Sequence, residues 1–549
     1  MKINISILIL FFAVTKVIGQ TFITFQMNLD DLTKQGLFSN NLGDELYIRG
    51  SFNDWKENNF KLEKSPDSDL FTGTFEFGNV GDTISYKFVI IKNQRHLFWE
   101  SNPNPNNTDN GNRQLIIDKD SIVLPPACFH YDEYFVYPVK FSEKKLKEDF
   151  LEFRSILETT HPALYDYTSK EVLDSIFESN YQKINSELEF SRFLILLTEV
   201  ISKVGCGHSS LWVPEKFWNV APEKLFPLKL LISGNKTIVK GSFSSIQDIP
   251  VGSEIISINN QAINLILARL SSLTSADGFN SSYRRTEVAQ NFSVKYAFAF
   301  GFPDSFTVEY MTLNNRQRIQ KTIYPVSKEA IDEGIPRLSE LSYKQIDGIN
   351  TGVLTINTFG YYGNVDMFRN FIDSVFLEIN KSHTKNLILD LRGNSGGDPF
   401  CASYLWGYLE PEALPYFDEH YGKYDTLANP IPKHKYNFNG ELFTLIDGHG
   451  FSTTGHFCAL LKYYEVGTFI GSELGSTYTC TGNATYPQLK NSGIIVGTAR
   501  VGRYTAAVKN MNPMKGVLPD YSIELTQNEI IERKDSVMDF TISLIKSKF

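Results

Sequence analysis

The chain has 549 residues, of which 42% are hydrophobic and 13% aromatic, and its formal net charge is −9 at pH 7. This length predicts roughly three or four domains, and the composition excludes a disordered chain. The negative charge argues against a general nucleic-acid binder and against a protein that binds anionic membranes, so we expect no nucleic-acid partner.

The N-terminal sequence MKINISILILFFAVTKVIGQ combines an early lysine with a mostly apolar run from Ile3 to Val14. This pattern is typical of a secretory signal peptide over residues 1–19. A membrane anchor is the alternative, but the run is shorter than the ~20 residues that a span needs, and Lys16 interrupts it. No later segment has the apolar length of a membrane span. We therefore expect an exported mature chain, periplasmic or extracellular, without a membrane span.

Short alternating runs of apolar and polar residues, separated by turn residues, follow over residues 20–124. The runs ELYIRGSFNDW, LFTGTFEFG and TISYKFVII predict an antiparallel β-sandwich for this segment. Residues 125–141 begin with two prolines and are predicted to be a linker.

The spacing of apolar residues becomes helical over residues 142–224, where the last helix leads directly into the segment GCGHSSL. Residues 225–328 return to β character. Residues 329–549 alternate strands with helices, which predicts a layered α/β domain. The ligand site of such a domain usually lies in the loops at the carboxyl ends of its strands.

Two glycine-rich turns follow buried strands of this α/β segment. In LDLRGNSGG the glycines let a ligand approach the backbone, and successive N–H groups can hold an oxyanion. Taken alone, that motif is more often a plain strand-to-helix turn. In DGHGFSTTGHF, Ser452 stands where a helix should begin. A serine there is usually an N-cap, but a sharp strand-to-helix turn can also expose a nucleophile.

The five cysteines are scattered through the chain, which argues against a disulfide framework and leaves at least one thiol unpaired within the chain. Cys206-x-His208 and His456-x-Cys458 suggest metal only weakly, because the sequence has neither CxxC pairs nor an HExxH helix. We expect no metal and no other cofactor.

The segments LILDLRGNSGG, FTLIDGHGFSTTGHF and VGTFIGSELGS together resemble the tail-specific (C-terminal processing) serine peptidase family, most closely its tricorn-core-like branch. GCGHSSL and the late GVLPDY fit the same family, so the resemblance runs from about Phe141 to the C-terminus. It implies a multidomain α+β chain with a crotonase/ClpP-like layered α/β peptidase domain over 329–549. A helical part over 142–224 and a PDZ-like β domain over 225–328 would precede it.

The resemblance also implies acyl transfer at a peptide bond, with Ser452 as the nucleophile. The N–H groups of Thr453 and of Gly396 or Gly397 would hold the oxyanion that forms. In the tail-specific branch the base is a lysine, but spacing puts Thr477 at that position of this chain. The nearest later lysine, Lys490, lies out of register in a polar turn, so a Ser–Lys dyad is not expected.

Three histidines remain as candidate bases. His449 and His456 neighbour the serine in sequence, but need not point back at its hydroxyl. His208 belongs to GCGHSSL, which resembles the Asp-x-His segment of the tricorn-core-like branch, where a histidine supplies the base. Cys206 replaces the usual aspartate, so the residue that orients His208 is left open. Two weak candidates for that orienting role are Glu473 and Ser209.

The N-terminal motifs ELYIRGSFNDW, SYKFVI and FWESNPNP resemble family-twenty-like starch-binding modules of amylolytic enzymes. An indole can cover the apolar face of a sugar while polar neighbours bond its hydroxyls. The alternative is that the tryptophans belong to the core of the domain. Lys87 lies in a strand of alternating residues, and its side chain should face away from those of Tyr86 and Phe88. The resemblance places the glucan site on Trp55, Lys87, Trp99, Glu100 and Asn104.

The sequence therefore predicts a secreted serine endopeptidase that acts on proteins or peptides and carries a module for starch-like α-glucans. The alternative is a catalytically inactive peptidase fold that serves as a carbohydrate-binding or scaffold protein. A carbohydrate-active enzyme ranks last, because the C-terminal half shows a nucleophile turn rather than the paired carboxylates of a glycosidase.

Overall fold

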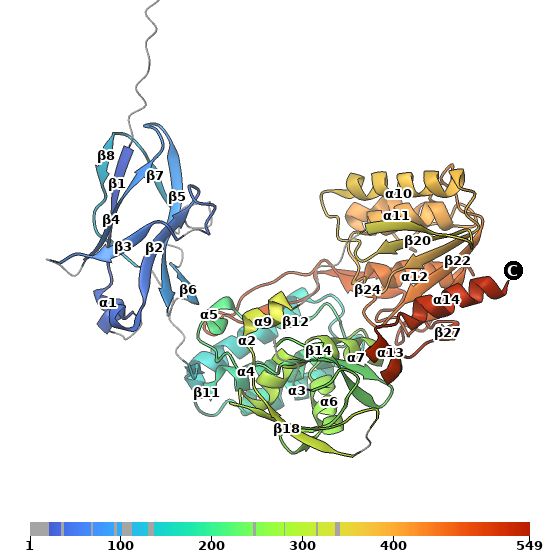
Figure 1. Cartoon of the computed structure of the whole chain (residues 1–549), viewed down its shortest axis with the longest axis horizontal. Coiled ribbons are helices and arrows are strands. Elements are labelled where there is room, and N and C mark those ends of the chain that lie inside the picture. The colour runs from blue at the N-terminus through green and yellow to red at the C-terminus, as the bar shows by residue number, and fades with distance from the viewer. Residues whose placement is uncertain are drawn as a thin grey trace, which may run out of the picture. The chain divides into compact units, whose positions relative to one another are not determined.

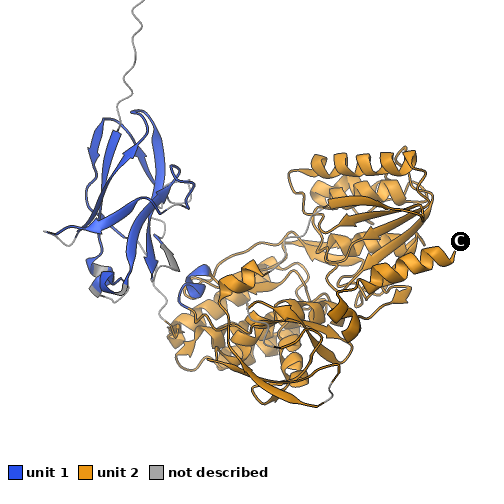
Figure 2. Cartoon of the chain, viewed as in Figure 1, with its two compact units in different colours: residues 1–136, 215–220 blue, residues 137–214, 221–549 orange. Residues whose placement is uncertain are grey.

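A computed structural model gives the fold as two compact units, residues 1–136 with 215–220 and residues 137–214 with 221–549 (Figure 2). The predicted signal peptide and the predicted sugar-binding residue Asn104 lie outside the described residues. No helix within the described part of the chain has the length and apolar character that crossing a membrane requires. The structure describes residues 21–34, 38–56, 58–66, 70–92, 96–100, 112–129, 137–244, 249–278, 280–314, 317–334 and 341–548.

The first unit is built mainly of β-strands that share one hydrophobic core. Strand β3 pairs with both β2 and β4, and β1, β2, β4 and β5 all contribute core residues. Along β5 the burial alternates, so Tyr86 and Phe88 belong to the core while Lys87 faces away, as predicted. The elements are β1 (Thr21–Asn28), α1 (Asp30–Lys34), η1 (Asn40–Leu42), β2 (Glu45–Gly50), β3 (Lys61–Lys64), β4 (Leu70–Phe77), β5 (Thr83–Lys92), β6 (His96–Trp99), β7 (Arg113–Ile116), β8 (Ser121–Val123), β9 (Ala127–Cys128) and α5 (Glu215–Trp218).

The second unit opens with helices that carry the chain to the GCGHSSL segment. Helix α4 is strongly amphipathic, and it ends at Gly205, whose φ of 72° lies in the left-handed region that favours glycine. The elements here are β10 (Lys140–Phe141), α2 (Glu143–Thr160), α3 (Lys170–Gln182), β11 (Leu188–Glu189), α4 (Phe190–Val204) and β12 (Ser210–Trp212).

An antiparallel sheet with its own core follows, in the strand order β13-β14-β15-β17-β18. Apolar residues of these strands and of helices α6 and α8 form that core. The elements are β13 (Leu228–Ser233), β14 (Lys236–Ser242), β15 (Glu254–Ile258), β16 (Gln261–Ala262), α6 (Ile263–Ser272), α7 (Ser281–Gln290), α8 (Phe292–Phe300), β17 (Phe306–Met311), β18 (Ile319–Ile323) and α9 (Lys328–Glu333).

The C-terminal part is a layered α/β domain, as predicted. Its sheet runs β19-β20-β21-β22-β23-β27, parallel except for the edge strand β19. Leu387 and Leu389 pack under α10 (Val365–Lys381), α11 (Pro399–Leu409) and α12 (Thr453–Tyr463), whereas Ile388 faces α14 (Ser536–Ser547) on the opposite side (Figure 1). Burial on both faces explains why the apolar run of β21 (Asn386–Asp390) is continuous. The sheet elements are β19 (Leu341–Ile346), β20 (Thr351–Ile356), β21 (Asn386–Asp390), β22 (Glu441–Ile446), β23 (Thr468–Gly471) and β27 (Tyr521–Ser522).

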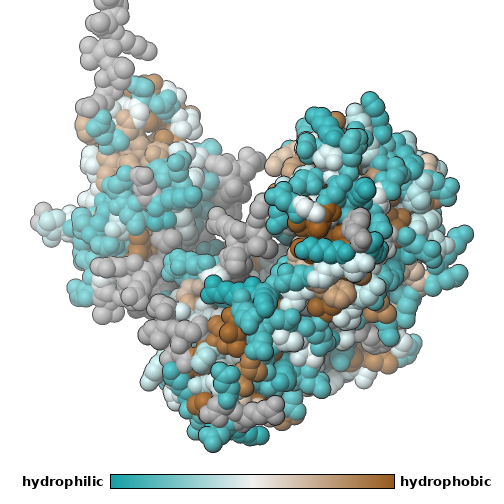
Figure 3. All heavy atoms as spheres, turned by 45° about the vertical axis from the view of Figure 1, so that its right-hand side comes forward, coloured by the Kyte–Doolittle hydropathy of each residue, from teal (hydrophilic) through white to brown (hydrophobic). Residues whose placement is uncertain are grey.

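Two small strand pairs complete this unit. Strand β12 pairs with β25, which joins the segment after His208 to the C-terminal part of the chain, and β24 pairs with β26. The face drawn in Figure 3 is mostly hydrophilic, with hydrophobic residues in small separate groups. The other elements are α10 (Val365–Lys381), α11 (Pro399–Leu409), η2 (Gly422–Ala428), α12 (Thr453–Tyr463), β24 (Thr479–Gly482), β25 (Ile495–Gly497), β26 (Val501–Thr505), α13 (Gln527–Glu532) and α14 (Ser536–Ser547).

Candidate active site

Ser452 lies on the sharp turn between β22 and α12. Its φ of 54° and ψ of −122° form a backbone conformation that residues other than glycine rarely adopt. The side chain makes no capping hydrogen bond to α12, although Ser452 occupies the N-cap position. The hydroxyl oxygen instead lies 3.1 Å from Nε2 of His208. The turn therefore presents the hydroxyl to an imidazole rather than to the helix.

The segment that follows α4 brings His208 to this turn from a distant part of the sequence. The imidazole packs against the ring of Phe451, with 4.7 Å between the ring centroids. Burial lowers the pKa of His208 to about 4, and the nearby His161 adds to this effect. The imidazole is therefore neutral at pH 7, and a neutral imidazole can accept a proton from a hydroxyl.

Nδ1 of His208 is buried and makes no hydrogen bond within the described part of the chain. The two predicted orienting residues do not bond to it. A carboxylate oxygen of Glu473 accepts the N–H of Gly516 at 3.0 Å, and the Ser209 hydroxyl makes no hydrogen bond to the imidazole. These contacts therefore do not support Glu473 or Ser209, the two weak candidates from the sequence, as the residue that orients His208.

Asp277 is the carboxylate that the fold places near His208. Donor atoms of Cys206, His208 and Asp277 all lie within 4.8 Å of one another. The Asp277 carboxylate accepts the N–H of Gly207 at 2.7 Å and the hydroxyl of Ser476 at 3.2 Å. Burial raises the pKa of Asp277 to about 6, and these two hydrogen bonds oppose the rise.

Sequence reasoning missed Asp277, because it lies in the loop TSADGF between α6 and α7, far in sequence from every catalytic motif. Its only signal was an Asp-Gly pair, which is an ordinary turn sequence. The same three donor atoms are also the group in the described structure that could hold a metal ion, since thiolate, imidazole and carboxylate are all zinc ligands.

The two glycine-rich turns touch each other beside Ser452. A Cβ atom added to Gly396 would lie 2.9 Å from Cβ of Ser452 and 3.0 Å from the backbone nitrogen of Thr453. The hydroxyl of Thr453 donates to the carbonyl of Gly397 at 2.6 Å. The N–H of Gly396, however, donates to the side chain of Asn394 at 2.9 Å. Of the predicted oxyanion donors, Gly397 and Thr453 are therefore better suited than Gly396.

The other candidate bases point elsewhere. The Thr477 hydroxyl donates to the carbonyl of Thr479 at 3.0 Å, and Lys490 is exposed. Nε2 of the buried His456 lies 3.4 Å from the sulfur of Cys480. Burial lowers the pKa of His456 to about 3. Within the described residues, the Ser452 hydroxyl contacts Nε2 of His208 and also hydrogen-bonds with the Cys480 thiol, whose pKa burial raises, so His208 is the contact that can act as a base.

His449, the third histidine, is placed by its backbone rather than by a bond to Ser452. Its N–H donates to the carboxylate of Asp447 at 3.0 Å, and its Nδ1 is buried without a partner in the described structure. The same carboxylate accepts the N–H of Gly393 at 3.1 Å, so Asp447 ties the two glycine-rich turns together.

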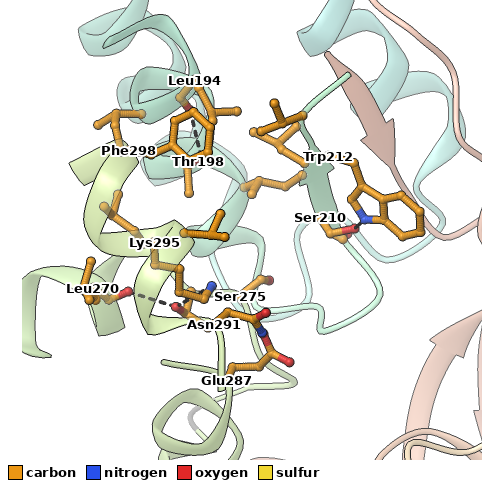
Figure 4. A pocket seen from close by; sticks show the side chains of 18 of the residues that line it. Leu194, Thr198, Ser210, Trp212, Leu270, Ser275, Glu287, Asn291, Lys295 and Phe298 are labelled. Atoms are coloured by element: carbon orange, nitrogen blue, oxygen red, sulfur yellow. Dashed lines mark hydrogen bonds between the residues drawn. The ribbon is translucent and has the colours of Figure 1, made fainter. Parts of the chain in front are cut away.

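A cavity of 360 Å³ borders the segment that carries His208 (Figure 4). Leu194, Leu270 and Phe298 give it an apolar lining, and Figure 4 shows the Lys295 side chain among them. The Lys295 ammonium donates to the hydroxyl of Thr274 at 3.3 Å, and burial lowers its pKa. The cavity is wide enough for an apolar side chain of a bound ligand.

Of the predicted sugar-binding residues, the two tryptophans lie together in the first unit. The rings of Trp55 and Trp99 have centroids 6.2 Å apart, and neither residue belongs to the hydrophobic core. Lys87 pairs in register with Arg49, whose guanidinium lies 5.6 Å from the centre of the Trp99 ring. These side chains share the face of the sheet that is turned away from the core.

Glu100 differs from the other predicted sugar-binding residues. It is 1% exposed and forms a bidentate ion pair with Arg113, at 2.5 and 3.0 Å. Because this buried carboxylate is paired with the guanidinium, Glu100 has a structural role and is not accessible to a sugar hydroxyl.

Comparison with known proteins matches residues 350–523 to the family described as Peptidase family S41. That segment contains both glycine-rich turns and Ser452, whereas His208 and Asp277 lie before it. A comparison with curated protein sequences found no significant match.

Two solved structures of CPAF have a similar fold at low sequence identity. Mature CPAF in complex with lactacystin is 14% identical, with a TM-score of 0.52 over 74% of this chain and 99% of that one. A second structure of mature CPAF is 15% identical, with a TM-score of 0.52 over 74% and 98%. The photosystem II D1 C-terminal processing protease is 14% identical, with a TM-score of 0.38 over 71% and 98%.

Proposed function

We propose that this chain, a serine peptidase with an S41 peptidase domain, hydrolyses internal peptide bonds through an acyl-enzyme on Ser452. The single observation that carries the proposal is the 3.1 Å contact between the Ser452 hydroxyl and Nε2 of His208. It is supported by the strained backbone of Ser452, because such strain persists where the surrounding structure enforces it and is typical of active sites.

In the proposed first step, Ser452 Oγ attacks the scissile carbonyl carbon while its proton passes to Nε2 of His208. The carbonyl oxygen becomes an oxyanion, which the N–H groups of Gly397 and Thr453 stabilise. Each such donor contributes about 3–4 kcal/mol to the transition state. His208 then gives the proton to the leaving amine, and the amine departs from the acyl-enzyme.

In the second step, a water molecule gives a proton to His208 and attacks the ester carbonyl. The tetrahedral intermediate collapses as His208 returns the proton to Ser452 Oγ, which releases the new carboxyl end of the peptide. Asp277 has the position of the group that orients the imidazole and favours its charged form during both steps. Apo structures often hold such catalytic contacts at longer distances than the working complex.

The finer domain assignments belong to the same proposal. Residues 20–124 would form a starch-binding β-sandwich whose glucan platform is the pair Trp55 and Trp99, supported by their proximity outside the core. Residues 225–328 would form a PDZ-like domain, supported by their separate antiparallel sheet and core. The leader sequence supports export to the periplasm or the medium.

The proposal is tested by peptide cleavage with purified single variants. Ser452→Ala and His208→Ala should each lower kcat/KM by about 10³-fold or more, because members of one catalytic unit fail together. Thr477→Ala should change kcat/KM by less than about fivefold, since that hydroxyl is committed to a local turn.

Two control variants test whether the loss of activity is specific to His208. His449→Ala and Lys490→Ala should retain most of their activity. If His208→Ala kept wild-type activity while one of those controls lost it, His208 would not be the base. A folded wild-type protein that cleaves no peptide would instead favour an inactive, carbohydrate-binding or scaffold protein.

A further inference from the structure

Three side chains of different chemistry converge beside the proposed nucleophile. Cys206 and His208 lie on the segment after α4, and Asp277 lies on the loop between α6 and α7. Donor atoms of the three side chains all lie within 4.8 Å of one another. Cys206 and Asp277 are only 3% and 2% exposed and His208 is half-buried, so the cluster lies mostly inside the protein rather than on its surface.

This donor set matches one class of metal ion. Zinc sites are built from thiolates, imidazoles and carboxylates in a tetrahedron, with a water or another ligand in the fourth position when the protein supplies three. Calcium and magnesium prefer oxygen ligands, and the thiolate therefore argues against them. One thiolate, one carboxylate and one neutral imidazole also balance the two charges of Zn²⁺, which suits a buried site.

The geometry requires a small closure around the ion. In a tetrahedral zinc site the ligand atoms are about 3.4–3.6 Å apart, given the usual bond lengths of about 2.0–2.3 Å. The three donors lie within 4.8 Å of one another, so the side chains need to move closer together by about 1 Å to reach that spacing. Nδ1 of His208 is buried and lacks a hydrogen-bond partner in the described structure, which leaves it able to bind an ion.

We propose that Cys206, His208 and Asp277 form a zinc site, and that Zn²⁺ bound there reversibly switches off the peptidase. The inhibitory effect rests on the proposed function, in which His208 is the base, whereas the binding of zinc does not. A water molecule would complete the coordination.

Inhibition follows from the chemistry of imidazole. A neutral imidazole has one basic lone pair, and its other ring nitrogen carries a hydrogen. Zinc binding uses that lone pair, whichever ring nitrogen is the ligand. His208 can then no longer accept the proton of Ser452, so an occupied site has no base. The switch should therefore reduce kcat in proportion to occupancy without creating a form of intermediate activity.

The sequence predicts no metal, because Cys206-x-His208 is accompanied by neither CxxC pairs nor an HExxH helix. The fold supplies Asp277 from a loop that the sequence does not relate to the motif. Cys206, which replaces the aspartate of the family pattern, is the residue that makes the cluster specific for a thiophilic ion. In the described structure its sulfur lies 2.9 Å from the hydroxyl of Thr481, a contact that a serine can also make.

The experiment compares zinc binding and zinc inhibition in matched variants. The parent is Cys128→Ser, which removes the exposed thiol that could bind metal nonspecifically. Cys206→Ser and Cys480→Ser are made in this background, and the second controls for the neighbouring Cys480–His456 pair. Zn²⁺ affinity is measured by isothermal titration calorimetry in metal-free buffer, and each variant's cleavage rate is normalised to its own rate in EDTA.

The parent should bind one Zn²⁺ per chain and lose cleavage in step with binding, and EDTA should restore it. With Co²⁺ as the probe, the parent should show a thiolate-to-metal charge-transfer band in the near ultraviolet. Cys206→Ser should lose that band and weaken zinc binding at least about 100-fold, which is the scale seen for losing a supporting residue of a metal site. Cys480→Ser should behave like the parent.

Equal zinc affinity in Cys206→Ser and the parent would overturn the site. If Cys206→Ser failed to fold, the absence of a thiolate band in the Co²⁺-loaded parent would overturn it just as well. Tight, thiolate-dependent binding that left cleavage unchanged would overturn the inhibitory role. A parent that binds zinc through Cys206 but cleaves no peptide would sink the proposed function and leave the zinc site standing.

Discussion

At the scale of single residues, the proposed site depends on a histidine that burial keeps neutral. The pKa of His208 is lowered to about 4, while that of Asp277 is raised to about 6. His208 must be neutral to accept a proton, so a lowered pKa means that activity survives below the ordinary histidine pKa of ~6.5. Protonation of Asp277 near pH 6 would remove the charge that favours the imidazolium.

We therefore predict that kcat/KM, measured in EDTA, is flat above pH 6.5 and falls between about pH 6 and pH 4. The fall belongs to the coupled pair rather than to either residue alone. A pH–rate profile with a peptide substrate checks this. An acid limb with its midpoint at or above pH 6.5 would contradict the buried, neutral state of His208.

The role of Asp277 is tested by Asp277→Asn, which keeps the shape of the side chain but removes its charge. We expect kcat to fall about 10³-fold or more, with KM nearly unchanged, because the carboxylate acts on the transition state rather than on binding. The upper part of the acid limb should disappear from the pH profile of the residual activity. A merely structural role would lower kcat without changing that profile.

Sequence reasoning reached Ser452 and His208 through family motifs, but it did not find Asp277. The serine and the histidine stand in recognisable local patterns, a strand–turn–helix and GCGHSSL. Asp277 stands in an ordinary loop, and non-local hydrogen bonds hold that loop against the His208 segment, such as those that Gly278 N–H and the Ser275 hydroxyl donate to the carbonyls of Gly205 and Cys206. Residues that act through a non-local contact leave no periodic or spacing signal in one sequence.

At the scale of secondary structure, an arginine links the first glycine-rich turn to α14. Arg392 pairs with Asp390 at the end of β21 and with Asp535 at the N-cap of α14, at distances of 2.6–2.9 Å. Burial alone would raise the pKa of Asp535, but the hydrogen bonds from Arg392 hold it below its usual value. The link fixes the turn that precedes Gly396 and Gly397.

We predict that Arg392→Ala lowers the free energy of unfolding by about 2 kcal/mol, since it strands two carboxylates of which one is largely buried. Urea unfolding followed by circular dichroism measures the change. The matched control is Arg318→Ala, which breaks an exposed ion pair with Glu309. Arg318→Ala should lower the free energy of unfolding by less than about 1 kcal/mol. If the two variants lost the same free energy of unfolding, Arg392 would have no special structural role.

The sequence predicted the individual strands and helices better than it predicted which strands pair. Alternating strands and helices predicted the α/β domain, and buried parallel strands explain why their apolar runs were continuous. The short pair of β12 with β25 was not foreseen, because its strands are three residues long and far apart in the chain. That pair helps to bring the His208 segment to the α/β domain.

At the scale of the whole molecule, the chain combines the peptidase with a separate β-rich unit. We predict that Trp55→Ala and Trp99→Ala each weaken binding to soluble starch or a cyclic maltooligosaccharide by about tenfold, because each removes one aromatic platform. Affinity electrophoresis in starch gels measures this, and peptide cleavage should stay unchanged.

Trp212→Ala is the matched control for this prediction. Its indole is 53% exposed on the second unit, so its loss should leave starch binding as it is in the wild type. Wild-type protein that migrates identically with and without starch would mean that the first unit does not bind glucan.

The most direct test of the central claim is the reaction of the folded protein with a fluorophosphonate probe, which labels activated serines. We predict that mass spectrometry finds one label on Ser452 of the wild type, that Ser452→Ala takes none, and that His208→Ala reacts about 10³-fold more slowly. Folded wild-type protein that never reacts, or one labelled at another residue, would contradict the assignment of Ser452 and His208 as nucleophile and base.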